Sequence, residues 1–246
     1  MALSGTLLNV ATVLAGTIIG LLVGSRMSTR MQSTLTDGLG LFTLVIGASM
    51  ALSIFTSPLA QPGDDLAVLG ALLGGAALGE LLRITERLDA LGDWFQRRLA
   101  RDGSPSRVSE AFVTASLIFC VGPLTILGSL ENGLTGEIRL LAIKSLLDGV
   151  ASIAFAAALG PGVALAAITV LVVQGGIALA AALFGSGLDE RAILGISATG
   201  GLILIGVALR LLDVKRVRVA SFLPALVLAP LLLIAAEAIR RALSAA

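Results

Sequence analysis

Apolar runs of membrane-spanning length recur along almost the whole chain, and no other feature limits the possible folds as strongly. Hydrophobic residues make up 57% of the sequence and charged residues 13%, whereas soluble proteins have about a quarter charged residues. A transmembrane helix needs about 20 predominantly apolar residues, so the 246 residues leave room for about eight spans and little else. The sequence therefore predicts an all-α polytopic membrane protein, with one integral membrane domain covering 1–246.

Gly, Pro and charged residues separate the expected transmembrane helices. We expect eight spans, at 5–25, 36–57, 66–83, 109–128, 139–159, 162–184, 192–211 and 219–238. The one long polar insert, 84–107, has apolar residues at helical spacing, which indicates an amphipathic cytoplasmic helix in the interface or a solvated linker helix. Glu80, late in the third span, is expected to pair with Arg83 one turn on.

Most Lys and Arg residues fall in three segments between the expected spans, namely 26–30, 83–107 and 210–218. Because basic loops stay on the cytoplasmic side, we expect a multi-pass membrane protein with both termini on the outer side. No basic region precedes the first span, which indicates an uncleaved span and not a secretory signal.

A weak internal repeat relates the first three spans to the last three. VLAGTIIGLL (13–22) resembles VVQGGIALAA (172–181), and LVIGASMAL (44–52) resembles ILIGVALRL (203–211) at the same offset. Units five spans apart have opposite orientations, so we expect inverted repeats on either side of a central broken-helix pair. The units would be 5–83 and 161–240, around 108–160. Chance recurrence of Gly, Ala, Leu and Ile in apolar sequence is the alternative.

Glycines are dense in several spans, and they predict close packing of helices. Gly16, Gly20 and Gly24 form two overlapping GxxxG steps, a pattern typical of contacts within a bundle or a homodimer.

The residue types that the chain lacks exclude several functions. The absence of His and the single Cys120 argue against zinc sites, serine–histidine hydrolysis and intrachain disulfides. The net charge of +1 gives no footprint for nucleic acid. We expect no enzyme activity, no cofactor and no nucleic-acid partner, and the metal question stays open. An intramembrane Ser–Lys enzyme is a weak alternative, because Lys144 and Ser145 are neighbours that face different ways on a helix.

Polar residues gather in the central pair of spans. Gly122-Pro123 interrupts the fourth span, and the freed backbone groups of such a break either bind a solute or are satisfied by neighbouring helices. Glu131 and Asn132 follow in a glycine-rich stretch expected as a re-entrant or outer loop, either solvated or at the mouth of a pathway.

The fifth span carries its polar groups on one stripe, with Ser145, Asp148 and Ser152 at helical spacing. Lys144 lies one turn before Asp148, which predicts a buried i,i+4 ion pair that is either functional or structural. Asn9 and Gln174, in the first and sixth spans, are expected to make interhelical hydrogen bonds more than to bind substrate. The candidate binding residues are Asn9, Gly122, Pro123, Thr125, Ser129, Glu131, Asn132, Lys144, Ser145, Asp148, Ser152 and Gln174.

Four segments resemble the bacterial "domain of unknown function 554" family, the YdfK/YqgA-like inner-membrane proteins. These segments are GPLTILGSLENGLTG (122–136), KSLLDGVASIAFAAALGPGV (144–163), QGG (174–176) and RVRVASFLPAL (216–226). The resemblance covers nearly the whole chain and implies a multi-pass protein of the bacterial inner membrane, for which transport is the usual conjecture. The outer side on which we expect the N-terminus would then be the periplasm. The family pattern has Gln-Asp where this chain has Glu131-Asn132.

Together these features favour a secondary transporter or permease that moves a small ion or solute by alternating access around a midplane site. Its partners would be the lipid bilayer, the transported species and, as an option, a second copy of the chain. The alternative is a non-transporting membrane scaffold or regulator that acts through 84–107.

Overall fold

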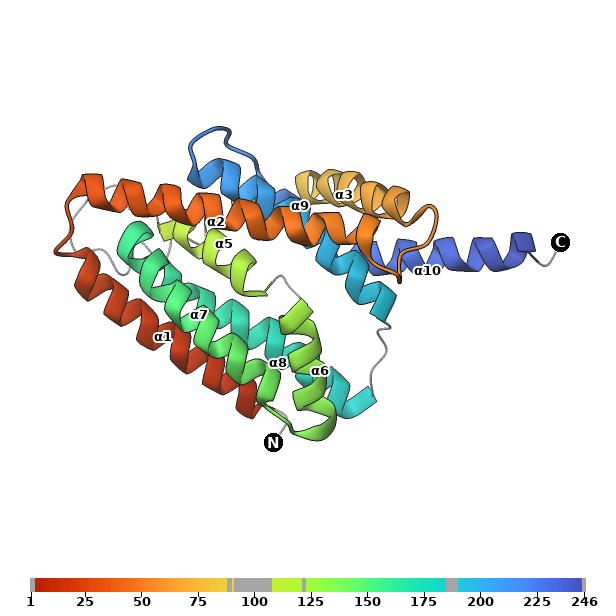
Figure 1. Ribbon diagram of the computed structural model, residues 1–246, viewed down its shortest axis with the longest axis horizontal. Coiled ribbons are helices and arrows are strands. Elements are labelled where there is room, and N and C mark those ends of the chain that lie inside the picture. Colours follow the sequence, from red (N-terminus) through yellow and green to blue (C-terminus); the bar gives the residue numbers. More distant parts are fainter. Residues whose placement is uncertain (1–2, 88–89, 91–107, 121–122, 185–189, 245–246) are drawn as a thin grey trace. The chain divides into compact units, whose positions relative to one another are not determined.

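The computed structural model describes residues 3–87, 90, 108–120, 123–184 and 190–244, and within these ranges every regular element is a helix (Figure 1). The α-helices are α1 Ser4–Gly24, α2 Thr29–Thr56, α3 Asp64–Leu81, α5 Val108–Cys120, α6 Pro123–Thr135, α7 Arg139–Leu159, α8 Ala166–Phe184, α9 Glu190–Leu211 and α10 Ala225–Ser244. Two short 3₁₀ helices, η1 Pro161–Leu165 and η2 Val219–Phe222, precede α8 and α10. The prediction of an all-α protein is confirmed.

Six stretches of helix in the described residues are long and apolar enough to cross a membrane, and they involve α1, α2, α7, α8 with η1, α9, and α10 with η2. α5 and α6 together form a seventh candidate, bent by 61° at a short break. α3 occupies the place of the third expected span, but Asp64, Asp65 and Glu80 lie within its 18 residues. The predicted count of eight therefore depends on α3.

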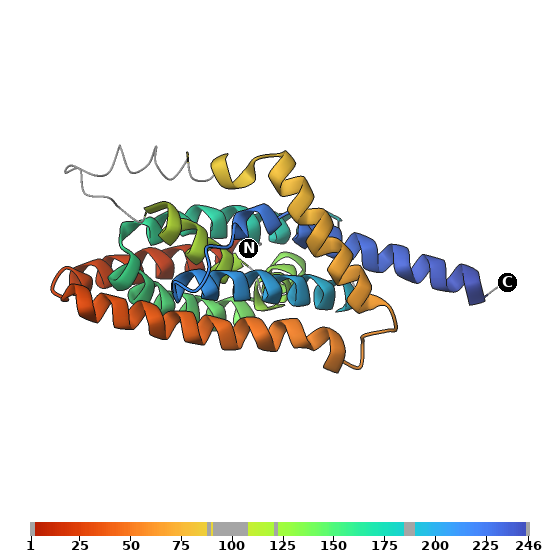
Figure 2. The same ribbon diagram turned by 90° about the horizontal axis from the view of Figure 1, so that it is seen from above.

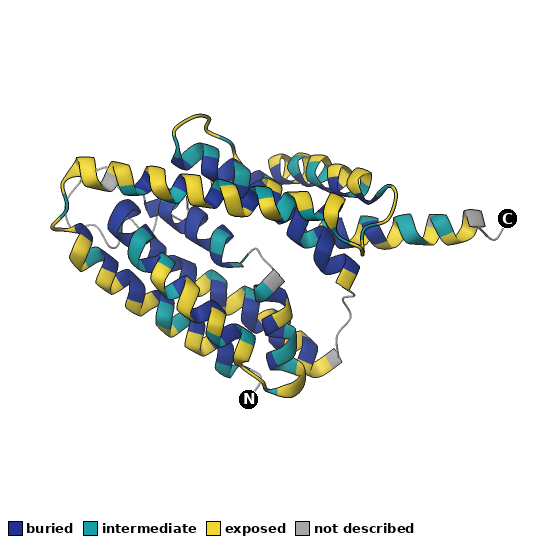
Figure 3. Cartoon of the chain, viewed as in Figure 1, coloured by how far each residue is buried: buried dark blue, intermediate teal, exposed yellow. Residues whose placement is uncertain are grey.

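The chain divides into two compact units. The first contains α1, the beginning of α2, and α5 to α8, and the second contains the rest of α2, α3, α9 and α10. Outward-facing side chains of the first unit are large and apolar, for example Ile18, Leu22 and Leu146, which are 61%, 65% and 68% exposed (Figure 3). Such surfaces suit lipid, which is as apolar as the side chains themselves.

α1 and α7 lie side by side in the first unit (Figure 1). A Cβ placed on Gly16 or Gly20 would meet the α7 backbone, at the carbonyls of Gly149 and Ile153. Residue numbers rise together along the contact, from Gly5 beside Leu141 to Gly24 beside Ala157, so the two helices run parallel. The sequence prediction that this glycine stripe mediates close helix packing is confirmed, and the partner helix is α7.

The broken pair α5–α6 follows η1 and α8 in one direction. α5 contacts Gly162 through Val108 and bonds Thr169 through Ser116, with 3.0 Å between the hydroxyls. α6 then meets the later part of α8, where a Cβ on Gly133 would lie 2.9 Å from Ala181 Cβ. The predicted break is confirmed, and the chain continues along α8 after it.

In the second unit, α3 packs against α10 in the opposite direction (Figure 2). The contacts run from Gly70 beside Leu232 to Gly79 beside Ser221. α2 and α9 are also antiparallel, because Gly47 lies against Leu204 whereas Ala51 lies against Gly201. Ile54, Val68, Leu194 and Ala198 form an apolar cluster between these helices.

Three sequence expectations meet different outcomes. Glu131 and Asn132 lie in α6, which continues to Thr135, so the expected outer loop is wrong, whereas the bent pair α5–α6 agrees with either a broken span or a re-entrant segment. Gly128 and Gly133 pack closely against α7 and α8. The predicted amphipathic helix 84–107 lies outside the described residues except for 84–87 and 90. The inverted repeat stays a prediction. It would make α1 equivalent to α8 and α3 equivalent to α10, and the two helices of each of these pairs are in contact.

Candidate functional site

The polar stripe predicted on α7 is buried along its length. Ser145, Asp148 and Ser152 are at most 7% exposed. The Ser145 hydroxyl donates to the Leu141 carbonyl at 2.6 Å, and the Ser152 hydroxyl donates to the Asp148 carbonyl at 2.7 Å. Both serines thus place their hydroxyl protons on their own helix, and the charged groups of the stripe are Asp148 and the adjacent Lys144.

Lys144 and Asp148 form the predicted i,i+4 ion pair, and both side chains are less than a tenth exposed. Asn9 on α1 joins them, because its Nδ2 donates to Asp148 Oδ2 at 2.8 Å. Desolvation of two charges is costly, and their mutual attraction offsets it only when the geometry is good and further hydrogen bonds are made. Asn9 supplies such a bond, and its expected interhelical role is confirmed.

The same bond fixes the orientation of the Asn9 amide. An ionised carboxylate only accepts hydrogen bonds, so the NH₂ group must face Asp148 and the carbonyl oxygen Oδ1 must face elsewhere. That oxygen is buried and has no hydrogen-bond partner among the described residues. Asn9 therefore presents an unused acceptor beside the ion pair.

Gln174 on α8 is fully buried, and neither its Oε1 nor its Nε2 has a partner in the described part of the chain. Among the residues that the structure describes, Gln174 therefore does not make the expected interhelical hydrogen bond. Leaving a buried polar group unsatisfied costs about 1–3 kcal/mol. Unlike a hydroxyl, which can turn back to its own helix, an amide in the middle of a helix needs a partner from outside.

Gln174 lies on α8, which packs against α1. The adjacent Gly175 faces α1, where its Cβ would lie 3.8 Å from Thr6 Cγ2. Gly133 of α6 contacts Ala178. Ser129 lies one helical turn before Gly133, and Gln174 lies one turn before Ala178. Thr6 and Ser129 are fully buried and their hydroxyls also lack described partners.

We call Thr6, Asn9, Ser129, Lys144, Asp148 and Gln174 the buried polar cluster. It draws on α1, α6, α7 and α8, all in the first unit. Sequence reasoning missed Thr6, although its i,i+3 spacing from Asn9 places both on one face of the first span.

Other predicted site residues have structural partners. Asn132 links α6 to the start of α1, since its Oδ1 accepts from the Gly5 amide at 3.3 Å and its Nδ2 donates to Ser4 Oγ at 3.4 Å. Thr125 spans the helix break by donating to the Phe119 carbonyl at 3.1 Å. Both therefore act in the first place as connectors.

The remaining candidates lie at the break or on another face. Pro123 begins α6, where the missing N–H of proline costs nothing, and Gly122 lies outside the described residues. Glu131 is half-buried, and its Oε2 has no described partner. It sits two residues from Ser129 and so faces away from the buried polar cluster.

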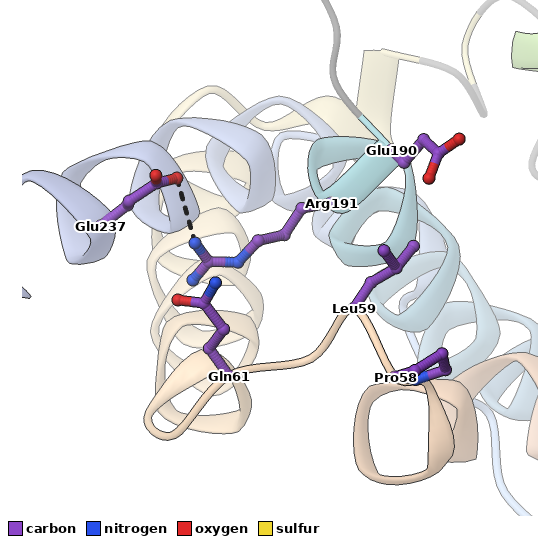
Figure 4. Close-up of a pocket in the computed structure, with 6 residues that line it drawn as sticks. All are labelled: Pro58, Leu59, Gln61, Glu190, Arg191 and Glu237. Atoms are coloured by element: carbon purple, nitrogen blue, oxygen red, sulfur yellow. Dashed lines mark hydrogen bonds and ion pairs between the residues drawn. The ribbon is translucent and has the colours of Figure 1, made fainter.

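A second buried charge network occupies the second unit. Arg191 of α9 forms a two-pronged ion pair with Asp64, in which Nε donates to Oδ2 at 2.9 Å and Nη2 to Oδ1. Its Nη1 donates to Glu237 of α10 at 3.1 Å (Figure 4). Arg240 Nη2 also donates to Asp64 Oδ1, at 3.3 Å. The sequence gives no local sign of this network, because Asp64 and Arg191 are 127 residues apart.

An open pocket of about 480 Å³ adjoins this network (Figure 4). It is lined by Pro58, Leu59, Gln61, Glu190, Arg191 and Glu237. Arg191 pairs with two carboxylates there. The ion pairs therefore join α3, α9 and α10, and they leave this guanidinium already engaged and not open to a ligand.

Glu80 departs from the expected local pair with Arg83. Its carboxylate accepts instead from Arg218 at 2.7 Å and from Ser221 Oγ at 2.8 Å. The close approach of η2 to α3 at Gly79 places these donors nearer than the next turn of the helix.

The donor types of the buried polar cluster limit what it could hold. Among the described residues, no three carboxylate or thiol side chains come together as a metal-binding group. The cluster offers one carboxylate, with neutral amide and hydroxyl oxygens. Such a set suits a weakly charged or neutral ligand better than a divalent metal ion.

Comparison with known proteins finds one family that matches most of the chain. The family model described as "Protein of unknown function (DUF554)" matches residues 4–234. An uncharacterized membrane protein, YdfK of Bacillus subtilis (strain 168), is 29% identical over 93% of this chain and 95% of its own length. An uncharacterized protein, YqgA of Escherichia coli (strain K12), is 31% identical over 92% of this chain and 94% of its own. No solved structure matches.

Proposed function

The chain belongs to the DUF554 family of uncharacterised membrane proteins, and from this premise we propose that it is a secondary transporter or permease for a small ion or solute. The buried polar cluster would be its binding site. The proposal also places the protein in the bacterial inner membrane, with both termini on the periplasmic side because the basic segments 26–30, 83–107 and 210–218 then face the cytoplasm.

The observation that carries the proposal is a buried ion pair bonded to one amide with an unused oxygen, together with a second unused amide on a helix that packs against α1. Asn9 Oδ1 and both polar atoms of Gln174 have no described partner. Asn9 bonds Asp148 directly, and Gln174 lies on α8, which packs against α1. A purely structural ion pair gains from the Asn9 Nδ2 bond, but it does not need the buried Asn9 Oδ1 or Gln174, which add a desolvation cost without a compensating bond. A ligand that exchanges partners with these atoms accounts for them.

Hydroxyl groups alone would not support this inference. Ser197 and Thr199 on α9 also lack described partners, but Ser and Thr side chains can turn to the carbonyl one turn back, as Thr17 does with Val13. The two amides cannot do so in the middle of a helix.

Helix directions support a topology of eight crossings. The parallel packing of α1 and α7 requires an odd number of crossings between them. α2 is one, and the one-way course of α5–α6 beside the span η1–α8 favours a second. α3 would then be the third, with Asp64 and Glu80 near its ends held by Arg191 and Arg218.

The antiparallel packing of α2 and α9 agrees with this count. It needs an even number of crossings between the two helices, and α3, α5–α6, α7 and η1–α8 make four. An even total of eight puts both termini on one side.

Reconstitution tests the transport proposal directly. Purified protein in liposomes is offered a panel of monovalent cations, small anions and neutral solutes, and uptake is followed together with the thermal stability of the detergent-solubilised protein. We expect at least one species to be taken up and to raise the melting temperature. Absence of both effects across the panel, together with a cellular role that survives Asp148→Asn, would contradict transport and favour a scaffold.

A further inference from the structure

We propose that the buried polar cluster binds a monovalent cation in exchange for the proton of Lys144, so that the protein couples cation movement to opposite movement of H⁺. This inference rests on the proposed transport function and adds the class of substrate and the coupling.

The unused atoms of the cluster are mainly acceptors. Asn9 Oδ1 and Gln174 Oε1 can only accept, and the hydroxyl oxygens of Thr6 and Ser129 can accept as well, whereas Gln174 Nε2 is the one unused group that can only donate. An anion would have to displace Asp148 from the Lys144 ammonium, the one charged donor of the cluster, and would approach the Asp148 carboxylate itself. A partly dehydrated cation would find amide and hydroxyl oxygens of the kind that hard cations prefer.

One negative charge governs the cluster. Asp148 is its only carboxylate, and the Lys144 ammonium neutralises that charge. α1 and α8 have no ionisable side chain at all between their ends. The other ionisable groups on the helices packed around the pair are Glu110 and Cys120 on α5, Glu131 on α6 and Arg139 on α7.

None of these other groups substitutes for Asp148. Arg139 is exposed at the start of α7, Glu110 lies in the first turn of α5, and Glu131 faces away from the cluster. The Cys120 thiol is near enough to interact with both charges, but it is not a carboxylate. Excess positive charge in the cluster would therefore remain uncompensated.

Charge balance then requires an exchange. A second positive charge in a buried, low-dielectric site is unfavourable, so a cation on Asp148 and a proton on Lys144 exclude each other. When the cation binds the Asp148 carboxylate, the Lys144 ammonium leaves Oδ2, releases one H⁺ to water and becomes a neutral amine. The site keeps zero net charge in both states, which favours a monovalent over a divalent ion.

Proteoliposomes with an internal pH indicator test the exchange. Inward gradients of Na⁺, K⁺ or Li⁺ are imposed with matched chloride, and a voltage-sensitive dye reports any net charge movement. We expect at least one cation to drive internal alkalinisation, with no voltage signal. Cation uptake that develops a voltage without moving protons would overturn the coupling, and uptake confined to anions or neutral solutes would overturn the cation assignment.

Variants of the ion pair separate exchange from a structural role. Asp148→Asn should abolish both exchange and cation-induced thermal stabilisation. Lys144→Met should retain cation-induced stabilisation but lose its dependence on pH. Asp64→Asn is the matched control, because Asp64 is also a buried, paired carboxylate, and it should keep exchange in whatever protein folds. Equal loss of stabilisation in the Lys144 and Asp148 variants would contradict the proposal.

Gln174→Met keeps the inference testable if the charge variants fold poorly. It removes an unused acceptor without disturbing the ion pair, so the cation concentration for half-maximal exchange should rise at least tenfold. Thr17→Val, on α1 but with its hydroxyl already bonded to Val13, should change it less than twofold. An unchanged half-maximal concentration in Gln174→Met would exclude this amide from the site.

Failure of the exchange and failure of the proposed function give different results. If the protein moves an anion or a neutral solute, transport stands and the cation inference falls. If no species in the panel is moved or bound, both fall.

Discussion

Gln174 lies at the centre of α8 with both polar atoms desolvated and without described partners. The ligand-free fold therefore carries the cost of two unmade hydrogen bonds, which at other sites amounts to about 1–3 kcal/mol for each polar group. Natural sequences retain such costs chiefly where function needs the group.

Gln174→Met should for this reason stabilise the ligand-free protein, by about 1–3 kcal/mol in the free energy of unfolding. Unfolding in mixed micelles, followed by circular dichroism, measures the change. Thr17→Val is the comparison, since it breaks a formed hydrogen bond and should destabilise by about 1 kcal/mol. A loss of stability in Gln174→Met would mean that the amide has a structural partner.

Arg191 presents the opposite case, a buried charge with all its partners in place. Arg191→Met leaves the 1%-exposed Asp64 carboxylate with Arg240 and the Gln61 backbone amide as its described partners, and we expect a loss of about 3–5 kcal/mol. The double variant Arg191→Met/Asp64→Leu should recover most of it, because both charges are then gone. If the double variant is no more stable than the single one, the contribution of Arg191 lies in packing and not in charge pairing.

At the scale of elements, the contact between α1 and α7 decides how the site is assembled. Gly16 and Gly20 let the two backbones touch, and the same register sets Asn9 beside Asp148. Membrane helices associate through this kind of close packing because lipid offers no hydrophobic driving force between them.

Gly20→Leu should therefore separate α1 from α7 and greatly reduce the yield of folded protein in size-exclusion chromatography. Gly38→Leu is the matched control on α2, where no atom lies within 4 Å of the added Cβ, and it should behave as wild type. Normal folding of Gly20→Leu together with normal cation–proton exchange would show that the α1–α7 contact accommodates a large side chain at this position.

For the whole molecule, the direction of each helix makes the eight-crossing topology testable. In a Cys120→Ala background, single cysteines at Ser28 and Arg87 should react with a membrane-impermeant thiol reagent only from the cytoplasmic side, and cysteines at Ala60 and Gly136 only from the periplasmic side. Arg87 is the decisive position, because it follows α3. Labelling of position 87 from the periplasm would mean that α3 does not cross.

Much of the fold follows from local sequence. Apolar runs and their breaks predicted the helices, the interruption near Gly122-Pro123 and the glycine contacts, because span length and helical period act over 20 residues or fewer. The exception is the stretch after the break, where Gly128 and Gly133 suggested a loop but lie inside α6. Glycine frequency alone does not distinguish a flexible segment from a helix that packs closely.

By itself the sequence determined an all-helical membrane protein, the buried stripe of α7 and the Lys144–Asp148 pair, since an i,i+4 spacing fixes neighbours within one helix. Only the tertiary structure decided that Asn9 meets Asp148, that Gln174 is buried without a described partner, and that Arg191 clasps Asp64. The Asn9–Asp148 and Arg191–Asp64 contacts join residues more than a hundred positions apart. Their geometry depends on which helices pack together and in which direction, and no local periodicity encodes that choice.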